Sequence, residues 1–104
     1  MAGLGDIAGL LKQAQKMQKD LDEVQERLRE QVVEVSAGPV RVQVNGGMEL
    51  LSIQIDPKVV DPEKTEELEE LVLSAVRKGL DDARVIAKAE LGKLTGGLSL
   101  PGMH

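Results

Sequence analysis

The first third of the chain carries apolar residues at alternating spacings of three and four, the heptad pattern of one helix face. Asp6 is suited to cap such a helix, and neither Gly nor Pro interrupts residues 10–35. The pattern predicts a helix over residues 6–30, roughly 37 Å long at 1.5 Å per residue. We call its apolar residues the seam: Ile7, Leu10, Ala14, Met17, Leu21, Val24 and Leu28.

Beyond this helix the apolar period shortens to two, the spacing of a strand with one buried face. Gly38-Pro39 separates the first of three such runs from the second. Asn45-Gly46-Gly47 separates the second from the third, and Asn and Gly tolerate the positive φ that tight hairpins need. The pattern predicts three antiparallel strands whose buried positions are Val33, Val35, Val40, Val42, Val44, Leu51, Ile53 and Ile55.

A second helical pattern follows Asp61-Pro62, a pair suited to the N-cap and first position of a helix. We expect this helix over residues 62–91, ending near Gly92. Gly79 inside it predicts a close approach or a slight kink. The interpretation is therefore one domain over residues 1–94, followed by a flexible tail over 95–104.

The element order is helix, three strands, helix, which predicts an α+β domain with a three-stranded antiparallel sheet. Both helices are longer than the strands, which span only about 20 Å. The helices must therefore overhang the sheet, and the seam has more apolar length than one chain can cover. We expect oligomerisation through the seam and the sheet edges, with a homodimer as the simplest closed form.

Composition narrows the classes of function. The 104 residues contain no Cys, Phe, Tyr or Trp, and the one histidine is His104. Thiol catalysis, Cys-ligated metals and aromatic stacking of nucleic-acid bases are thereby excluded. We therefore expect no enzyme activity, metal, cofactor or small-molecule substrate. The longest apolar runs are far short of a membrane span and no secretory signal begins the sequence, so we expect a cytoplasmic protein with no membrane partner.

The net charge of −5 conceals two basic ends. Residues 1–19 and 74–104 each sum to +2, whereas residues 20–73 sum to −9. The expected chain path makes the helices antiparallel, so the N-terminal half of the first should lie beside the C-terminal half of the second. That placement gathers the basic residues, and we predict a polyanion-binding site comprising Lys12, Lys16, Lys19, Arg77, Lys78, Arg84 and Lys88.

Two interpretations of these charges stay open at this point. A charge run is ordinarily a solvated face, and the helix dipole accounts for bases near the end of the second helix. The helix dipole does not account for the lysines in the first half of the first helix. These like charges repel one another, and binding of an external polyanion offsets that repulsion. The alternative hypothesis is a protein-interaction module that uses the seam or a sheet edge and does not bind DNA. RNA also remains open as the polyanion.

Five segments, taken together and in this order, are typical of one known family. The segments are Leu11-Lys12-Gln13-Ala14-Gln15-Lys16-Met17-Gln18, Val40-x-Val42-x-Val44-Asn45-Gly46, Ile53-x-Ile55-Asp56-Pro57, Leu68-Glu69-Glu70-Leu71-Val72 and Gly96-Gly97-Leu98-x-Leu100-Pro101-Gly102. With them the chain resembles the YbaB/EbfC family of bacterial nucleoid-associated proteins. The resemblance implies a tweezer-like homodimer with projecting helices that bind double-stranded DNA with limited sequence preference. It further implies a nucleoid location and a role in nucleoid organisation and gene regulation.

The last helix departs from the family pattern at one place. The family commonly has Asn-Asp before an alanine, whereas this chain has Arg77-Lys78 before Gly79, followed by Asp81-Asp82. The charge is redistributed along this helix. The resemblance therefore leaves open which of its basic residues contact DNA.

Overall fold

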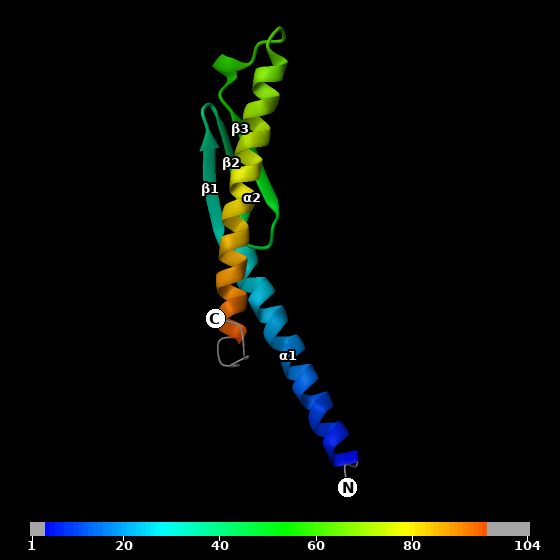
Figure 1. Cartoon of the computed structure of the whole chain (residues 1–104). Coiled ribbons are helices and arrows are strands. Elements are labelled where there is room, and N and C mark those ends of the chain that lie inside the picture. Colours follow the sequence, from blue (N-terminus) through cyan, green and yellow to red (C-terminus); the bar gives the residue numbers. More distant parts are fainter. Residues whose placement is uncertain (1–3, 96–104) are drawn as a thin grey trace, which may run out of the picture.

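The computed structural model describes residues 4–95, in the predicted order of helix, three strands and helix (Figure 1). The α+β fold class is thereby confirmed. No helix within this range is long and apolar enough to cross a membrane. The elements are α1 (Leu4–Glu30), β1 (Val32–Ala37), β2 (Val40–Asn45), β3 (Leu50–Ile55), the 3-10 helix η1 (Pro57–Val59) and α2 (Thr65–Thr95).

The three strands form one antiparallel sheet in the order β1-β2-β3, so β2 is central and both other strands are edges. One face of the sheet is polar, with Arg41 paired to Glu34 at 3.4 Å. On β3 the register shifts by one residue, because Val44 pairs with Leu50 and Gln43 with Ser52. This leaves Leu51 as an extra residue in β3.

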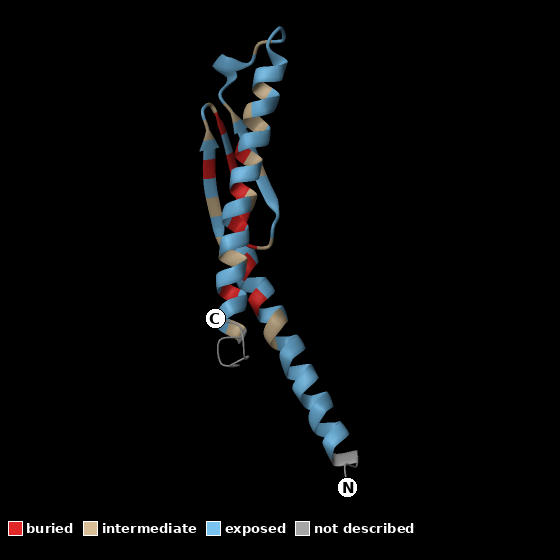
Figure 2. Ribbon diagram, viewed as in Figure 1, coloured by how far each residue is buried: buried red, intermediate tan, exposed pale blue. Residues whose placement is uncertain are grey.

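The hydrophobic core lies between the other face of the sheet and α2. The alternation along β2 places three valines on this face, all fully buried, and α2 lies across them (Figure 2). Gly79 is where the helix approaches most closely, because an added Cβ would lie 3.2–3.3 Å from valine side chains of β1 and β2. The predicted close approach at Gly79 is confirmed. The three buried valines of β2 are Val40, Val42 and Val44.

The start of α2 differs from the prediction. Asp61 does not cap the helix; its Oδ1 accepts a hydrogen bond from the Glu63 N–H at 3.0 Å, and its carbonyl accepts one from the Lys64 N–H at 2.9 Å. Asp followed by Pro suits the first two positions of a β-turn as well as a helix start. The turn forms here, and the helix begins three residues later than predicted, at Thr65.

The other helix ends also shift. α1 already begins at Leu4, so Asp6 lies inside its first turn, where a carboxylate favours the positive end of the helix dipole. α2 continues through Gly92 to Thr95, because a glycine weakens a helix without ending it. The rest of the predicted tail, including His104, lies outside the described residues.

Candidate nucleic-acid interface

The N-terminal part of α1 projects away from the rest of the molecule (Figure 1). Every residue from 6 to 19 is exposed, and we call this segment the arm (Figure 2). The arm lengthens the molecule, whose principal extents are 75 × 26 × 19 Å. Because the two helices run in opposite directions, α1 begins and α2 ends at the same end of the molecule.

The helices are antiparallel as predicted, but their neighbouring parts differ from the prediction. The last third of α1, not its first half, lies beside the C-terminal part of α2, and the arm continues past the end of α2 (Figure 1). Only Gln31 separates α1 from β1, so the end of α1 is fixed at the end of the sheet. α2 ends at Thr95, too early to reach the arm's tip.

The fixed end of α1 is built from both apolar and backbone contacts. Val24 and Leu28 are almost fully buried. The N–H of Gly46, in the turn after β2, donates to the carbonyls of Leu28 at 2.9 Å and Gln31 at 3.0 Å. A Cβ on Gly46 would lie 2.9 Å from Leu28 Cδ2 and 3.1 Å from Ile86 Cγ2. The turn therefore caps the end of α1 through hydrogen bonds and packs against it at van der Waals distance. We call this junction of Gly46 with Val24, Leu28 and Gln31 the root.

Asn45 organises the turn that forms this cap. Its side-chain Oδ1 accepts hydrogen bonds from the N–H groups of Gly47 at 3.0 Å and Glu49 at 3.1 Å, and its Nδ2 donates to Glu49 Oε1 at 2.9 Å. The predicted hairpin is confirmed, although the residue with positive φ is Met48, at 65°, and not Asn45 or a glycine. The glycine at position 46 is needed for its close approach to the root.

A buried carboxylate links α2 to the root. Glu90 is about nine-tenths buried, and its Oε1 accepts hydrogen bonds from Gln31 Nε2 at 3.1 Å and Lys93 Nζ at 3.3 Å. Its Oε2 lies 3.6 Å from Arg27 Nε. The hydrogen bond from Gln31, then that from Lys93, hold the pKa of Glu90 below its ordinary value, against the opposing effect of burial.

Sequence analysis did not single out Glu90 or Gly46 as positioning residues. A signal for Glu90 was present, because it follows Ile86 by four residues and so lies on the apolar face of α2, where an unpaired charge is costly. Its partners, Arg27 on α1 and Gln31 just beyond the end of α1, are 63 and 59 positions away in the sequence. No local pattern connects residues so far apart.

The three lysines of the predicted site on α1 extend along the outer part of this helix. Lys12, Lys16 and Lys19 are all exposed. None of them forms an ion pair or a side-chain hydrogen bond with any residue between positions 4 and 95. Because no carboxylate neutralises them, these lysines are available to an external polyanion.

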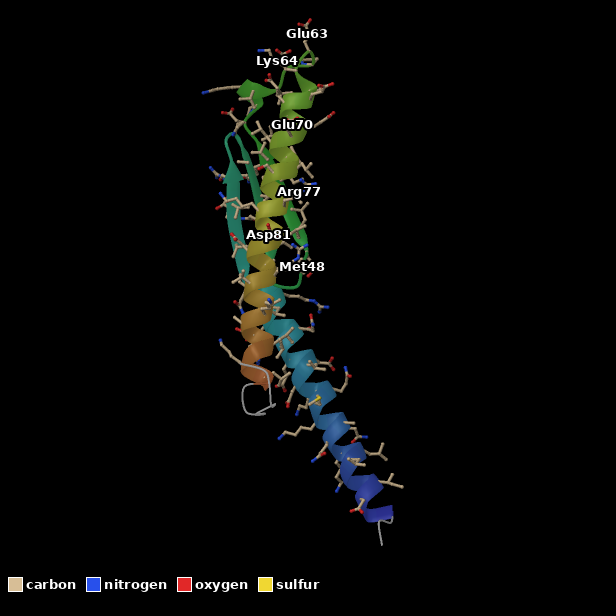
Figure 3. All side chains as sticks on the ribbon, in the orientation of Figure 1. Met48, Glu63, Lys64, Glu70, Arg77 and Asp81 are labelled. Carbon is tan, nitrogen blue, oxygen red and sulfur yellow. The ribbon has the colours of Figure 1, made fainter. Side chains whose placement is uncertain are left out.

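The predicted basic residues of α2 are exposed and are mixed with acids along the helix. Arg84 Nη1 is 2.6 Å from Asp81 Oδ1, so its charge is already paired. Figure 3 shows Glu70, Arg77 and Asp81 along one face of α2. Arg77, Lys78 and Lys88 are exposed. This face is therefore less basic than the arm.

The seven predicted basic residues do not form one compact patch in a single chain. The contact between Gly46, Leu28 and Ile86 fixes the relative levels of the two helices. Counted along α2 at 1.5 Å per residue, Arg77 lies about 14 Å from Ile86, in the direction of the sheet. Counted in the same way along α1, Lys12 lies about 24 Å from Leu28, in the opposite direction. The structure brings Lys19 nearest to Lys88 and leaves Lys12 far from Arg77.

The seam is covered only at the root. Val24 and Leu28 are buried and Leu21 is half-buried, whereas Leu10 is 65% exposed and Met17 51% exposed. A second exposed apolar surface lies along β3 and the adjoining side of α2. Its exposed side chains include Leu50, Ile53 and Leu73, and a shallow hollow beside them is lined by Ile55, Leu68, Glu69, Val72, Leu73 and Val76.

The sequence profile of the YbaB/EbfC DNA-binding family matches residues 3–98. The chain belongs to this family. A nucleoid-associated protein of Alkaliphilus metalliredigens is 43% identical, over 99% of this chain and 92% of that protein. One from Acetivibrio thermocellus is 47% identical, over 95% of this chain and 90% of that protein.

A solved structure confirms the fold of this YbaB/EbfC family member. An uncharacterized protein of Helicobacter pylori superposes with a TM-score of 0.73, covering 92% of this chain and 100% of that chain. The two sequences are 23% identical, so this likeness concerns the fold alone. The resemblance found in the sequence is thereby confirmed at the level of family and fold.

Proposed function

We propose that this chain is a nucleoid-associated protein that binds duplex DNA as a homodimer, mainly through phosphate contacts from the arm. One observation carries the proposal: Lys12, Lys16 and Lys19 are exposed, have no ion-pair partner among residues 4–95, and lie on a helix that projects beyond the body of the molecule. Phosphate contacts carry little sequence information, so we propose limited sequence preference. The arms place this contact away from the acidic middle of the chain.

The charge of the remaining molecule supports this orientation. Acidic residues are concentrated in residues 20–73, and the end opposite the arm carries Glu63 beside Lys64 (Figure 3). A DNA duplex approaching that end meets net negative charge, whereas one approaching the arm meets lysines. Complementary charge of this kind raises association rates and disfavours the wrong orientation. Arg77, Lys78, Arg84 and Lys88 on α2 are proposed as secondary contacts.

The test is a salt series of fluorescence-anisotropy titrations against several unrelated duplexes. For about 4–8 phosphate contacts per dimer, the logarithm of the binding constant should fall with the logarithm of salt at a slope of roughly −4 to −7. The triple variant K12Q/K16Q/K19Q should flatten the slope by about 2–5, because the dimer loses up to six cations. Similar affinities for all duplexes would support limited sequence preference.

The chain offers a matched control for this experiment. K12Q/K16Q and K58Q/K64Q remove the same charge from opposite ends of the molecule, and we expect only the former to flatten the slope. Equal effects would indicate a general charge response and would remove the arm from the interface. The absence of any DNA binding at low salt would instead favour the alternative, a protein-interaction module.

The second copy of the chain is proposed to cover β3 and the adjoining side of α2. β3 is an edge strand with unpaired backbone groups, and Leu50, Ile53 and Leu73 beside it are each more than two-fifths exposed. Exposed edges and apolar patches of this kind are normally covered in a native assembly. A two-fold axis through this surface would leave both arms free to project, as in a pair of tweezers.

Sedimentation equilibrium of I53Q/L73Q tests this interface. We expect the dimer to dissociate at least about tenfold more readily, because two apolar contacts are lost from each copy. The control is V85Q, which changes an exposed apolar residue of α2 outside the proposed surface. If L10Q/M17Q dissociates the dimer instead, the seam is the interface and the proposed surface is wrong.

A further inference from the structure

The arm can present its lysines in a defined direction only if the root fixes the angle of α1. From Leu28 to Lys12 the helix extends about 24 Å, so a rotation of about 10° at the root moves Lys12 by about 4 Å. No residue of the arm is buried, and direct support therefore comes only from the root. The contacts at the root determine where the lysines lie.

The apolar and backbone contacts at the root do not by themselves fix this angle. Val24 and Leu28 lie on one side of α1, and the two hydrogen bonds from Gly46 reach Leu28 in the last turn of the helix and Gln31 just beyond its end. These contacts hold the end of α1 in place and still permit rotation about that end. A second attachment, from α2 to a residue about 60–100° around the helix from Val24 and Leu28, would oppose such rotation, and Arg27 has that position.

Glu90 supplies the second attachment. Its carboxylate binds two residues four positions apart, Arg27 inside α1 and Gln31 just beyond its end, at 3.6 Å and 3.1 Å. The carboxylate is about nine-tenths buried and is also bound by Lys93 on its own helix, which fixes its position on α2. Attachment to a fixed group at two successive turns restrains the tilt of α1.

We propose that Glu90 is a positioning residue for the DNA-binding arm: by binding Arg27 and Gln31 it sets the direction in which α1 projects from α2. Glu90 itself does not touch DNA in this scheme. The part of the inference that concerns DNA rests on the proposed function, whereas the part that concerns the direction of α1 does not. A preorganised arm binds DNA more tightly because less conformational freedom is lost on binding.

The direction of α1 can be measured independently of DNA. The chain contains no cysteine, so Q15C/D82C carries spin labels only on the arm and on α2. Pulsed electron–electron distance measurements on labelled protein diluted with excess unlabelled protein report distances within one chain. We expect E90A to widen the distance distribution by about 3–5 Å, as a loss of angular restraint over some 20 Å of helix requires.

Two further variants guard against a loss of folding. R27Q removes an attachment from an exposed position and should produce a smaller widening in a folded protein. E26A is the matched control, because it also removes one carboxylate, but its pair with Arg29 lies within α1. Far-UV circular dichroism verifies folding. A distribution in E90A and R27Q as narrow as in the parent protein and E26A would overturn the proposal.

DNA titrations of the same proteins complete the test. We expect E90A to lower affinity about fivefold to tenfold with an unchanged salt slope, because the number of phosphate contacts stays the same. Unchanged affinity despite a widened distribution would overturn the positioning role. If the parent protein itself does not bind DNA, the proposed function fails, while the distance measurement still decides whether Glu90 sets the direction of α1.

Discussion

At the scale of single residues, the root depends on the absence of one side chain. Gly46 has no positive φ, so its importance is not conformational. It lies where an added Cβ would be 3.0 Å from the carbonyl oxygen of Leu28, a backbone atom that cannot move independently. Glycine is required here for close approach, and any larger residue must displace α1 from the turn.

We predict that G46A destabilises the protein by about 1–3 kcal/mol, the usual cost of forcing extra atoms into a packed region. The control G92A changes a helical glycine with open space around it and should leave stability unchanged or raise it by up to about 1 kcal/mol. Urea unfolding followed by far-UV circular dichroism gives both values, since the chain has no aromatic residues for fluorescence. Equal stability of G46A and the parent protein would contradict the close packing.

The pKa of Glu90 predicts a pH dependence of stability. Its folded-state pKa is lowered from 4.5, first by the hydrogen bond from Gln31, so folding favours the charged form. The resulting stabilisation is present above the unfolded-state pKa and is lost as the pH falls through the lower folded-state value. The stability difference between the parent protein and E90Q should therefore shrink as the pH falls from about 6 to below 4.5.

Urea midpoints measured across that range test this prediction, with E26Q as the control for a carboxylate on the surface of α1. Glu26 is an exposed carboxylate that pairs with Arg29 of its own helix, so E26Q controls for the removal of a surface charge. A stability difference for E90Q that stays constant with pH would show that the charge of Glu90 does not contribute.

At the scale of elements, the type and order of the helices and strands could be predicted well from the sequence, and their boundaries less well. Helical and strand spacing of apolar residues identified both helices and all three strands, because each type of element repeats its side-chain directions at its own period. The start of α2 predicted from Asp61-Pro62 was wrong, because the same two residues also suit a turn. Contacts between distant elements, such as Glu90 with Arg27, could not be predicted, since they depend on how the helices lie against each other.

α1 is one continuous helix with two environments. The seam pattern predicts that one face of α1 is buried along its whole length. In the single chain, the seam residues are at least partly buried only from Leu21 onward. Because a short isolated helix is marginally stable in water, the arm should open locally far more often than the root. We predict that in hydrogen exchange the amides of residues 8–19 exchange at least about tenfold faster than those of residues 22–30.

This exchange measurement is made at low protein concentration and repeated at high concentration and with duplex DNA. Protection of the arm that rises with concentration would indicate that the seam pairs between copies. Protection that rises only with DNA would agree with the arm as the binding element. Uniform protection along α1 under all conditions would contradict the division into arm and root.

At the scale of the whole molecule, charge follows the long axis. The arm lysines of the proposed site followed from the separation of charge along the sequence, and all three are exposed. The α2 residues were less predictable, because Arg84 pairs with Asp81 and Glu70 lies on the same face. The expected merging of both basic ends depended on how far each helix extends, which local patterns do not determine.

The opposite ends of the molecule have a practical consequence for anyone who labels or fuses it. α1 begins and α2 ends on the arm side, so a bulky label attached at either of these helix ends lies on the side of the proposed DNA contact (Figure 1). The connection between β3 and α2 lies at the far end, where Val60 and Glu63 are exposed. A small peptide tag inserted there would leave the arm unobstructed and make this connection the preferred site for imaging probes.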